Sequence, residues 1–167
     1  MINHHKVMRN LCDALTASDA VRLFCVGNFA KGCHIQLNAY GAEGLPDETQ
    51  APFIFVFSDG ENESAGEIGE ASFEVTIVAA VCSQTEGGTD IQAISERTKD
   101  ANGLTVVGIA EKADELLTIA LDVVKRGNHG AILRTATISG SGTLDYPLQW
   151  SRARLTFYES YTLSDDD

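Results

Sequence analysis

Residues 52–57 constrain the fold more than any other segment, because they form an expected strand that is apolar on both faces. The two faces carry Phe53, Phe55 and Phe57 on one side and Ile54 and Val56 on the other. A strand of this kind belongs near the centre of a sheet that is covered on both sides. The run therefore predicts a sheet protein with a substantial core.

Five further strands are expected around this run. The longest, residues 71–82, alternates an inward set with a solvent-facing set near its start: Phe73, Val75, Ile77, Ala79 and Val81 against Ser72, Glu74 and Thr76. The others are predicted at residues 21–26, 33–40, 131–138 and 149–163, with a hairpin turn at residues 27–32. The last strand alternates a buried with a polar set: Ala153, Leu155 and Phe157 against Arg152, Arg154 and Thr156.

Two main helices are predicted from apolar residues that recur three and four positions apart. The first is capped by Asn3 and runs to about Ala17. The second spans residues 109–126 and ends at Gly127. Its apolar stripe consists of Ala110, Ala113, Leu116, Leu117, Ala120, Leu121 and Val124.

The order of these elements predicts one α+β domain over residues 1–167. We expect a largely antiparallel or mixed sheet of about six strands, with the two main helices packed on one face. No apolar run approaches the ~18–20 residues that span a bilayer, and the first residues do not resemble a secretory leader. We therefore expect a soluble protein with no membrane partner.

The charge is segregated along the chain. The sequence holds 24 acidic and 12 basic residues, for a net charge of −12, which disfavours a general nucleic-acid clamp. Residues 32–96 contain no Lys or Arg but contain twelve acids: Glu43, Asp47, Glu48, Asp59, Glu61, Glu63, Glu67, Glu70, Glu74, Glu86, Asp90 and Glu96. Like charges gathered this way repel one another, so a role beyond folding is indicated.

Two ligand-binding patterns fit only in part. Residues 27–32 have the glycine spacing of a phosphate loop, but Cys33 and His34 stand where Lys and Ser or Thr are needed. Asp59, Glu61, Glu63 and Glu70 match positions of a calcium loop, but Ser64 replaces its glycine. The sequence therefore predicts no bound cofactor or metal, with calcium kept as an alternative.

No catalytic arrangement is predicted. Cys33 and His34 are neighbours in an expected strand, so their side chains point to opposite faces. The four cysteines, Cys12, Cys25, Cys33 and Cys82, are interpreted as reduced, and a partnership of Cys25 or Cys82 with a distant histidine stays open. Trp150, Tyr158 and Tyr161 are interpreted as packing residues, because no basic groove is expected beside them.

The layout of the chain resembles the tail terminator, or tail completion, proteins of long-tailed bacteriophages. The resemblance rests on the strands at residues 52–57 and 71–82, the helix at residues 109–127 and the ending at residues 147–157. It covers most of the chain as a similarity of order and length. No invariant motif contributes to it.

The resemblance implies a structural virion protein at the tail–neck junction, made in the host cytoplasm. Such proteins form hexameric rings that cap the tail tube, stop its growth and join the tail to the head. The implied partners are further copies of the chain, the tail tube protein and head–neck connector proteins, while DNA passes through without specific binding.

Two segments are expected to make these contacts. The acidic hairpin loop at residues 58–70, with Glu43, Asp47 and Glu48, would line the channel or dock on a partner; its acids are Asp59, Glu61, Glu63, Glu67 and Glu70. An arm at residues 83–103, with Ile91, Ile94 and Arg97, would reach the next subunit. The alternatives are a tail tube or head–neck protein, a cation-binding module, and a small hydrolase with an unrecognised site.

Overall fold

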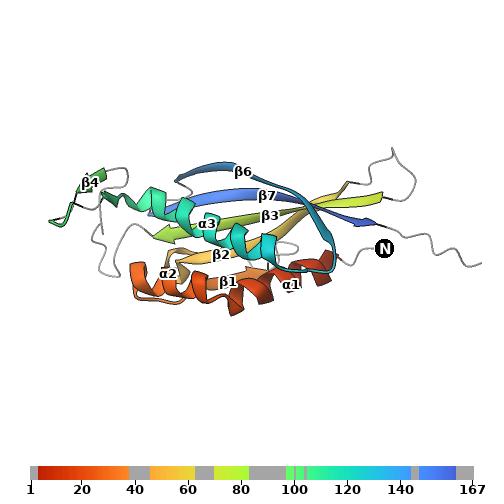
Figure 1. The fold of residues 1–167 in the computed structure, drawn as a ribbon, viewed down its shortest axis with the longest axis horizontal. Helices are drawn as coiled ribbons and strands as arrows, with labels where there is room; N and C mark the ends of the chain where they lie inside the picture. The colour runs from red at the N-terminus through yellow and green to blue at the C-terminus, as the bar shows by residue number, and fades with distance from the viewer. Residues whose placement is uncertain are drawn as a thin grey trace, which may run out of the picture.

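A computed structural model describes residues 4–37, 46–62, 70–82, 97–99, 101–103, 105–143 and 147–160. Within these ranges the fold contains three α-helices, a five-stranded mixed sheet and a separate two-stranded sheet (Figure 1). The predicted α+β class is confirmed. The predicted numbers of about six sheet strands and two main helices are corrected to five strands and three helices in the described chain.

The main sheet has the order β1-β2-β3-β7-β6. Its strands are β1 (His34–Leu37), β2 (Phe53–Asn62), β3 (Glu70–Cys82), β6 (Ile132–Thr143) and β7 (Leu148–Ser160). β1 pairs parallel to β2, and the other neighbours pair antiparallel. The central pair β3–β7 runs in unbroken register from Glu70 opposite Ser160 to Cys82 opposite Leu148. The apolar β2 lies inside the sheet, as its composition predicts.

The two sheet edges differ in length and regularity. β1 forms one edge with four residues, and β6 forms the other with twelve. The pairing of β6 with β7 shifts register twice, between Leu133 and Thr135 and between Ile138 and Gly140. Such irregularities bend a strand and interrupt its hydrogen-bond ladder.

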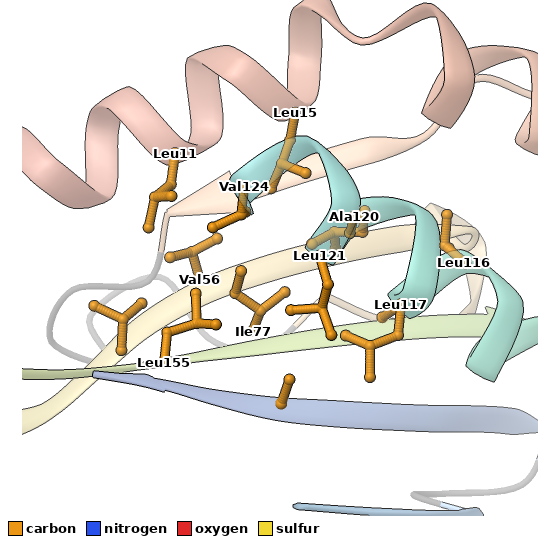
Figure 2. Close-up of a cluster of buried hydrophobic side chains, with 14 of the residues drawn as sticks. Leu11, Leu15, Val56, Ile77, Leu116, Leu117, Ala120, Leu121, Val124 and Leu155 are labelled. Atoms are coloured by element: carbon orange, nitrogen blue, oxygen red, sulfur yellow. The ribbon is translucent and has the colours of Figure 1, made fainter. Parts of the chain in front are cut away.

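The helices α1 (His4–Ala17), α2 (Asp19–Phe29) and α3 (Ile109–Arg126) lie on one side of the main sheet (Figure 1). α3 has the predicted bounds, and the members of its stripe from Ala113 to Val124 are buried. Figure 2 shows Leu117 and Leu121 of α3 directed toward the sheet, while Leu11 and Leu15 of α1 point into the same core on the side of Val124. Burying these side chains contributes about 1.5–3 kcal/mol each.

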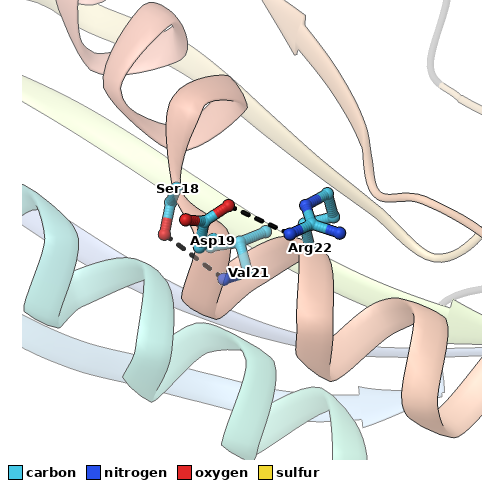
Figure 3. Close-up of polar contacts among 4 residues, drawn as sticks. All are labelled: Ser18, Asp19, Val21 and Arg22. Carbon is cyan, nitrogen blue, oxygen red and sulfur yellow. Dashed lines mark hydrogen bonds and ion pairs between the residues drawn. The ribbon is translucent and has the colours of Figure 1, made fainter.

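The segment predicted as a strand at residues 21–26 is instead the helix α2. Ser18 caps it: its Oγ accepts a hydrogen bond from the Val21 backbone N–H at 3.3 Å (Figure 3). Asp19 in the first turn pairs with Arg22 at 3.1 Å. Val21 and Cys25, four positions apart, are the buried residues of the helix. The predicted hairpin turn at residues 27–32 is therefore wrong, because a helix precedes β1.

Several strand limits also differ from the prediction. β2 continues through residues 58–62 and β3 begins at Glu70, so both ends of the predicted loop at residues 58–70 are strand, while residues 63–69 lie outside the described chain. β6 likewise includes residues 139–143, which were expected to separate the last two strands. Thr76, expected in solvent, is buried. Long paired strands satisfy more backbone hydrogen-bonding groups than loops would.

The sheet face opposite the helices is called the open face. In the described chain the helices pack against the other face, which holds the larger core cluster. A smaller buried apolar cluster occupies one end of the open face: Ala51, Phe53, Phe55, Val78, Ala80 and Leu148. β2 is thus apolar on both faces because both of its faces are covered, as the alternation of its residues predicts.

Candidate functional site

The acidic residues singled out from the sequence lie at two described places. Asp47 and Glu48 begin the 3-10 helix η1 (Glu48–Gln50) before β2, and both are exposed. Asp59 and Glu61 lie in the outer half of β2, and Glu70 begins β3. By register Glu61 is opposite Phe73, and Glu70 is opposite Ser160. Glu43, Glu63 and Glu67 lie outside the described residues.

Asp47 has a local structural role. It caps η1: its Oδ1 accepts hydrogen bonds from the hydroxyl and the backbone N–H of Thr49, the latter at 2.9 Å. The Gln50 side chain accepts in return from the Asp47 N–H at 3.1 Å. The bonds from Thr49 lower the pKa of Asp47 below its usual value. This reciprocal cap accounts for Asp47 without any partner molecule.

The predicted arm is described only at its end. Ile91 and Ile94 lie outside the described residues. Arg97 begins β4 (Arg97–Lys99), which pairs antiparallel with β5 (Thr105–Val107) of the same chain, Arg97 opposite Val107. Figure 1 shows this small sheet beyond the N-terminal end of α3, away from the main sheet. Residues 97–99 therefore form part of a short hairpin within the chain.

The open face carries an exposed cluster of arginines beside its buried apolar cluster. Arg134 of β6 and Arg152 and Arg154 of β7 are all exposed, and we call them the arginine strip. The Arg152 guanidinium lies over the Trp150 ring at 5.4 Å, and that of Arg134 lies over the Tyr158 ring at 5.8 Å. Cation–π contacts of this kind fix an arginine while leaving its charge unneutralised.

Two glycines of β6 make room for the tryptophan in this arrangement. Gly140 is opposite Arg152 and Gly142 is opposite Trp150. A Cβ atom at Gly142 would meet the Trp150 ring at 3.8 Å, and one at Gly140 would meet it at 3.7 Å. These are ordinary contact distances, so the indole lies along the glycine backbone. The Trp150 ring, over which Arg152 lies, therefore packs against the backbone of β6.

One carboxylate already lies against the strip. Glu74 of β3 approaches Arg154 with an oxygen–nitrogen distance of 4.0 Å. Both side chains are partly exposed, so this pair contributes little stability. In the described part of the chain, no ion pair joins a carboxylate to Arg134 or Arg152.

Trp150 packs against the smaller buried cluster, as predicted, but the arginine strip also lies beside Trp150 and Tyr158, where the sequence led us to expect no basic groove. The signal was present in the alternation of β7, which places Trp150, Arg152, Arg154 and Tyr158 on one face. Sequence reasoning missed Arg134, because the register shift between Leu133 and Thr135 alters the alternation of β6. The structure brings these residues together, and no other predicted site residue joins them among those described.

The cysteines and histidines form no catalytic pair in the described residues. Cys25 hydrogen-bonds Cys33; this bond, with burial, raises the pKa of Cys33, and it lowers the pKa of Cys25. Burial raises the pKa of Cys12 to about 12. The ring of His34 approaches the side chains of Gln36 and Gln50, at 3.2 and 3.3 Å. The raised pKa values make Cys12 and Cys33 poor nucleophiles, and the Cys25 thiol has no exposed surface from which it could attack a substrate.

His129 has a structural role at the end of α3. It is buried, and its Nε2–H donates to the Val124 carbonyl at 2.9 Å. Asn10 of α1 donates to the His129 carbonyl at 3.0 Å. The ring occupies the space beside Gly127. His129 therefore ties the end of α3 to α1.

Membrane-spanning helices and metal centres are two further features that the described residues could hold. None of their helices has the length and apolar character needed to cross a membrane. Among those residues no three His, Cys, Asp or Glu side chains gather as a metal site would require. The side chains of Asp59, Glu61, Glu63 and Glu70, on which the calcium alternative rests, lie outside the described part.

The sequence was compared with known proteins. No protein-family model matches the chain, and no curated protein matches it.

Proposed function

We propose that this chain is a structural subunit that assembles with copies of itself into a ring, acting as the terminator of a phage tail. The observation that carries the proposal is the asymmetry of the sheet. In the described chain all three helices cover one face, and the other face bears the exposed arginine strip. A patch of arginines that lie over aromatic side chains, on one face of a strongly acidic protein, suits contact with an acidic surface.

Two further features support this role. The order of elements, with β2 and β3 forming a long antiparallel pair and α3 preceding the β6–β7 pair, keeps the layout on which the phage resemblance rests. The base-free segment at residues 32–96 gives each copy a strongly negative region. Around a channel, the acids of this region that are not engaged with a neighbouring copy would repel DNA phosphates and let the polymer pass without binding.

Negative-stain electron microscopy combined with native mass spectrometry tests the proposal. Closed rings of one fixed copy number are the expected result for the purified protein. Open filaments would instead support the alternative of a tail tube protein. A protein that stays monomeric at high concentration would contradict the proposal, since ring closure is its central claim.

A further inference from the structure

We propose that the arginine strip docks the acidic segment, residues 59–70, of a second copy of the chain. The inference rests on the proposed ring and names the contact that would build it. It also selects between two roles for the acidic segment, lining a channel or docking on a partner. The partner surface is Arg134, Arg152 and Arg154 on the open face.

The strip is prepared to receive carboxylates. Rings hold Arg134 and Arg152 at 5.8 and 5.4 Å, so little side-chain freedom remains to be lost on binding. Both are exposed, and neither is paired with a carboxylate in the described part of the chain. Arg154 shows what the strip accepts, because its approach to Glu74 is already that of a guanidinium toward a carboxylate.

The acidic segment supplies the complementary charge. Residues 59–70 contain no base, and their five acids are Asp59, Glu61, Glu63, Glu67 and Glu70. Copies with a net charge of −12 repel one another at long range. A stable contact between them must therefore set a positive patch of one against a negative patch of the other. The strip is an exposed positive patch that meets this requirement.

The two surfaces occupy different parts of one sheet. The strip lies on β6 and β7, whereas the acidic segment joins the outer ends of β2 and β3, where Glu70 pairs with Ser160. Because the two surfaces are different patches, copies can join head-to-tail, which the proposed ring requires. Each copy in such a chain offers one unused surface of each kind, and the chain closes into a ring when the rotation between copies allows it; a reciprocal dimer or an open filament would contradict the proposed ring.

A nucleic acid is the competing occupant. Arginines beside half-buried aromatic rings also suit phosphates and bases. The charge of the whole chain opposes that occupant, because a polyanion would approach a body with twice as many acids as bases. A second copy brings its own acids in the same molecule, so it is the occupant that the charge distribution favours.

Reciprocal charge reversal tests the contact. The strip variant carries Arg134→Glu and Arg152→Glu, and the segment variant carries Glu61→Lys, Glu63→Lys and Glu67→Lys, so that three lysines outnumber the two remaining acids, Asp59 and Glu70. Alone, each variant sets like charges against each other at the contact. We therefore expect the protein concentration needed for assembly to rise at least about tenfold. An equimolar mixture restores both contacts, because every reversed strip meets a reversed segment. We expect mixed rings, in which the two variants alternate, by native mass spectrometry.

A matched control separates local contact from net charge. Arg22→Glu with Lys125→Glu reverses two exposed bases on the helices and changes the net charge as much as the strip variant does. It should assemble like the wild type. Salt gives a second readout, because raising it from about 0.05 M to 0.5 M should weaken wild-type rings by screening the docked charges. Circular dichroism checks that each variant is folded.

The outcomes are distinct. Wild-type rings that the strip variant forms equally well, or a mixture that fails to assemble, would overturn the docking inference and leave the proposed ring standing. A wild type without rings would overturn both. Unchanged rings together with binding of a labelled DNA duplex, lost in the strip variant, would assign the strip to nucleic acid instead.

Discussion

Replacing Gly127 by alanine tests the packing at the end of α3. A Cβ atom there would lie 2.6 Å from Cε1 and 2.8 Å from Nε2 of His129, far inside contact distance. The imidazole must move, and its 2.9 Å hydrogen bond to the Val124 carbonyl is then lost in a buried place. Leaving such a group unpaired costs about 1–3 kcal/mol. The smaller entropy of the unfolded alanine chain offsets about 0.4–1 kcal/mol of that cost.

Gly127→Ala should therefore destabilise the fold by about 1–2 kcal/mol. In a chain of this length, each kcal/mol lowers Tm by roughly 2–4 °C. Gly27→Ala is the matched control, because nothing lies within 4 Å of a Cβ at that position in α2. Alanine should stabilise that helix by about 0.5–1 kcal/mol. Urea unfolding with unchanged m-values measures both effects.

A double variant locates the cause. Once His129 is replaced by alanine, the Gly127→Ala substitution meets no ring and should lose most of its cost. Equal costs of Gly127→Ala with and without the His129 side chain would refute the reasoning. So would two glycine substitutions that shift stability in the same direction.

Three further predictions concern local contacts. Ser18→Ala removes the bond to the Val21 N–H and should cost about 1 kcal/mol in urea unfolding, whereas Ser18→Asn keeps a cap. By NMR, the pKa of Asp47 should lie below the usual value of 3.8 and should rise toward that value in Thr49→Ala. Because the pKa of Asp47 is lowered in the fold, its cap is present at neutral pH and is lost as the pH falls through that lowered pKa. The raised pKa of Cys12, about 12, means that at pH 8 it should react with a disulfide reagent more slowly in the native than in the unfolded protein; equal rates would contradict the raised pKa.

Strong periodicity made part of the fold predictable. α3 has its predicted bounds because its apolar stripe is regular and Gly127 follows the last turn. β3 and β7 follow their alternation closely, since each has one face on the core. In such segments local preference and tertiary packing favour the same structure.

Where local and tertiary signals differ, the prediction failed. Residues 21–26 are rich in residues that favour strands, yet the Ser18 cap and the spacing of Val21 and Cys25 make them helical. The parallel pairing of β1 with β2 depends on a distant connection that short-range patterns do not encode. For the candidate site, alternation in β7 indicates Arg152 and Arg154, but adding Arg134 requires the strand register.

The outline of the sheet limits how copies of this protein can meet. One border is a four-residue strand, and the other is broken twice by register shifts. Within the described residues, neither border offers the long, flat row of free backbone groups on which amyloid-like growth begins. A protein with such edge strands can reach high local concentrations during assembly without its sheets joining edge to edge into a fibre. Concentrated samples should accordingly stay negative for thioflavin T fluorescence.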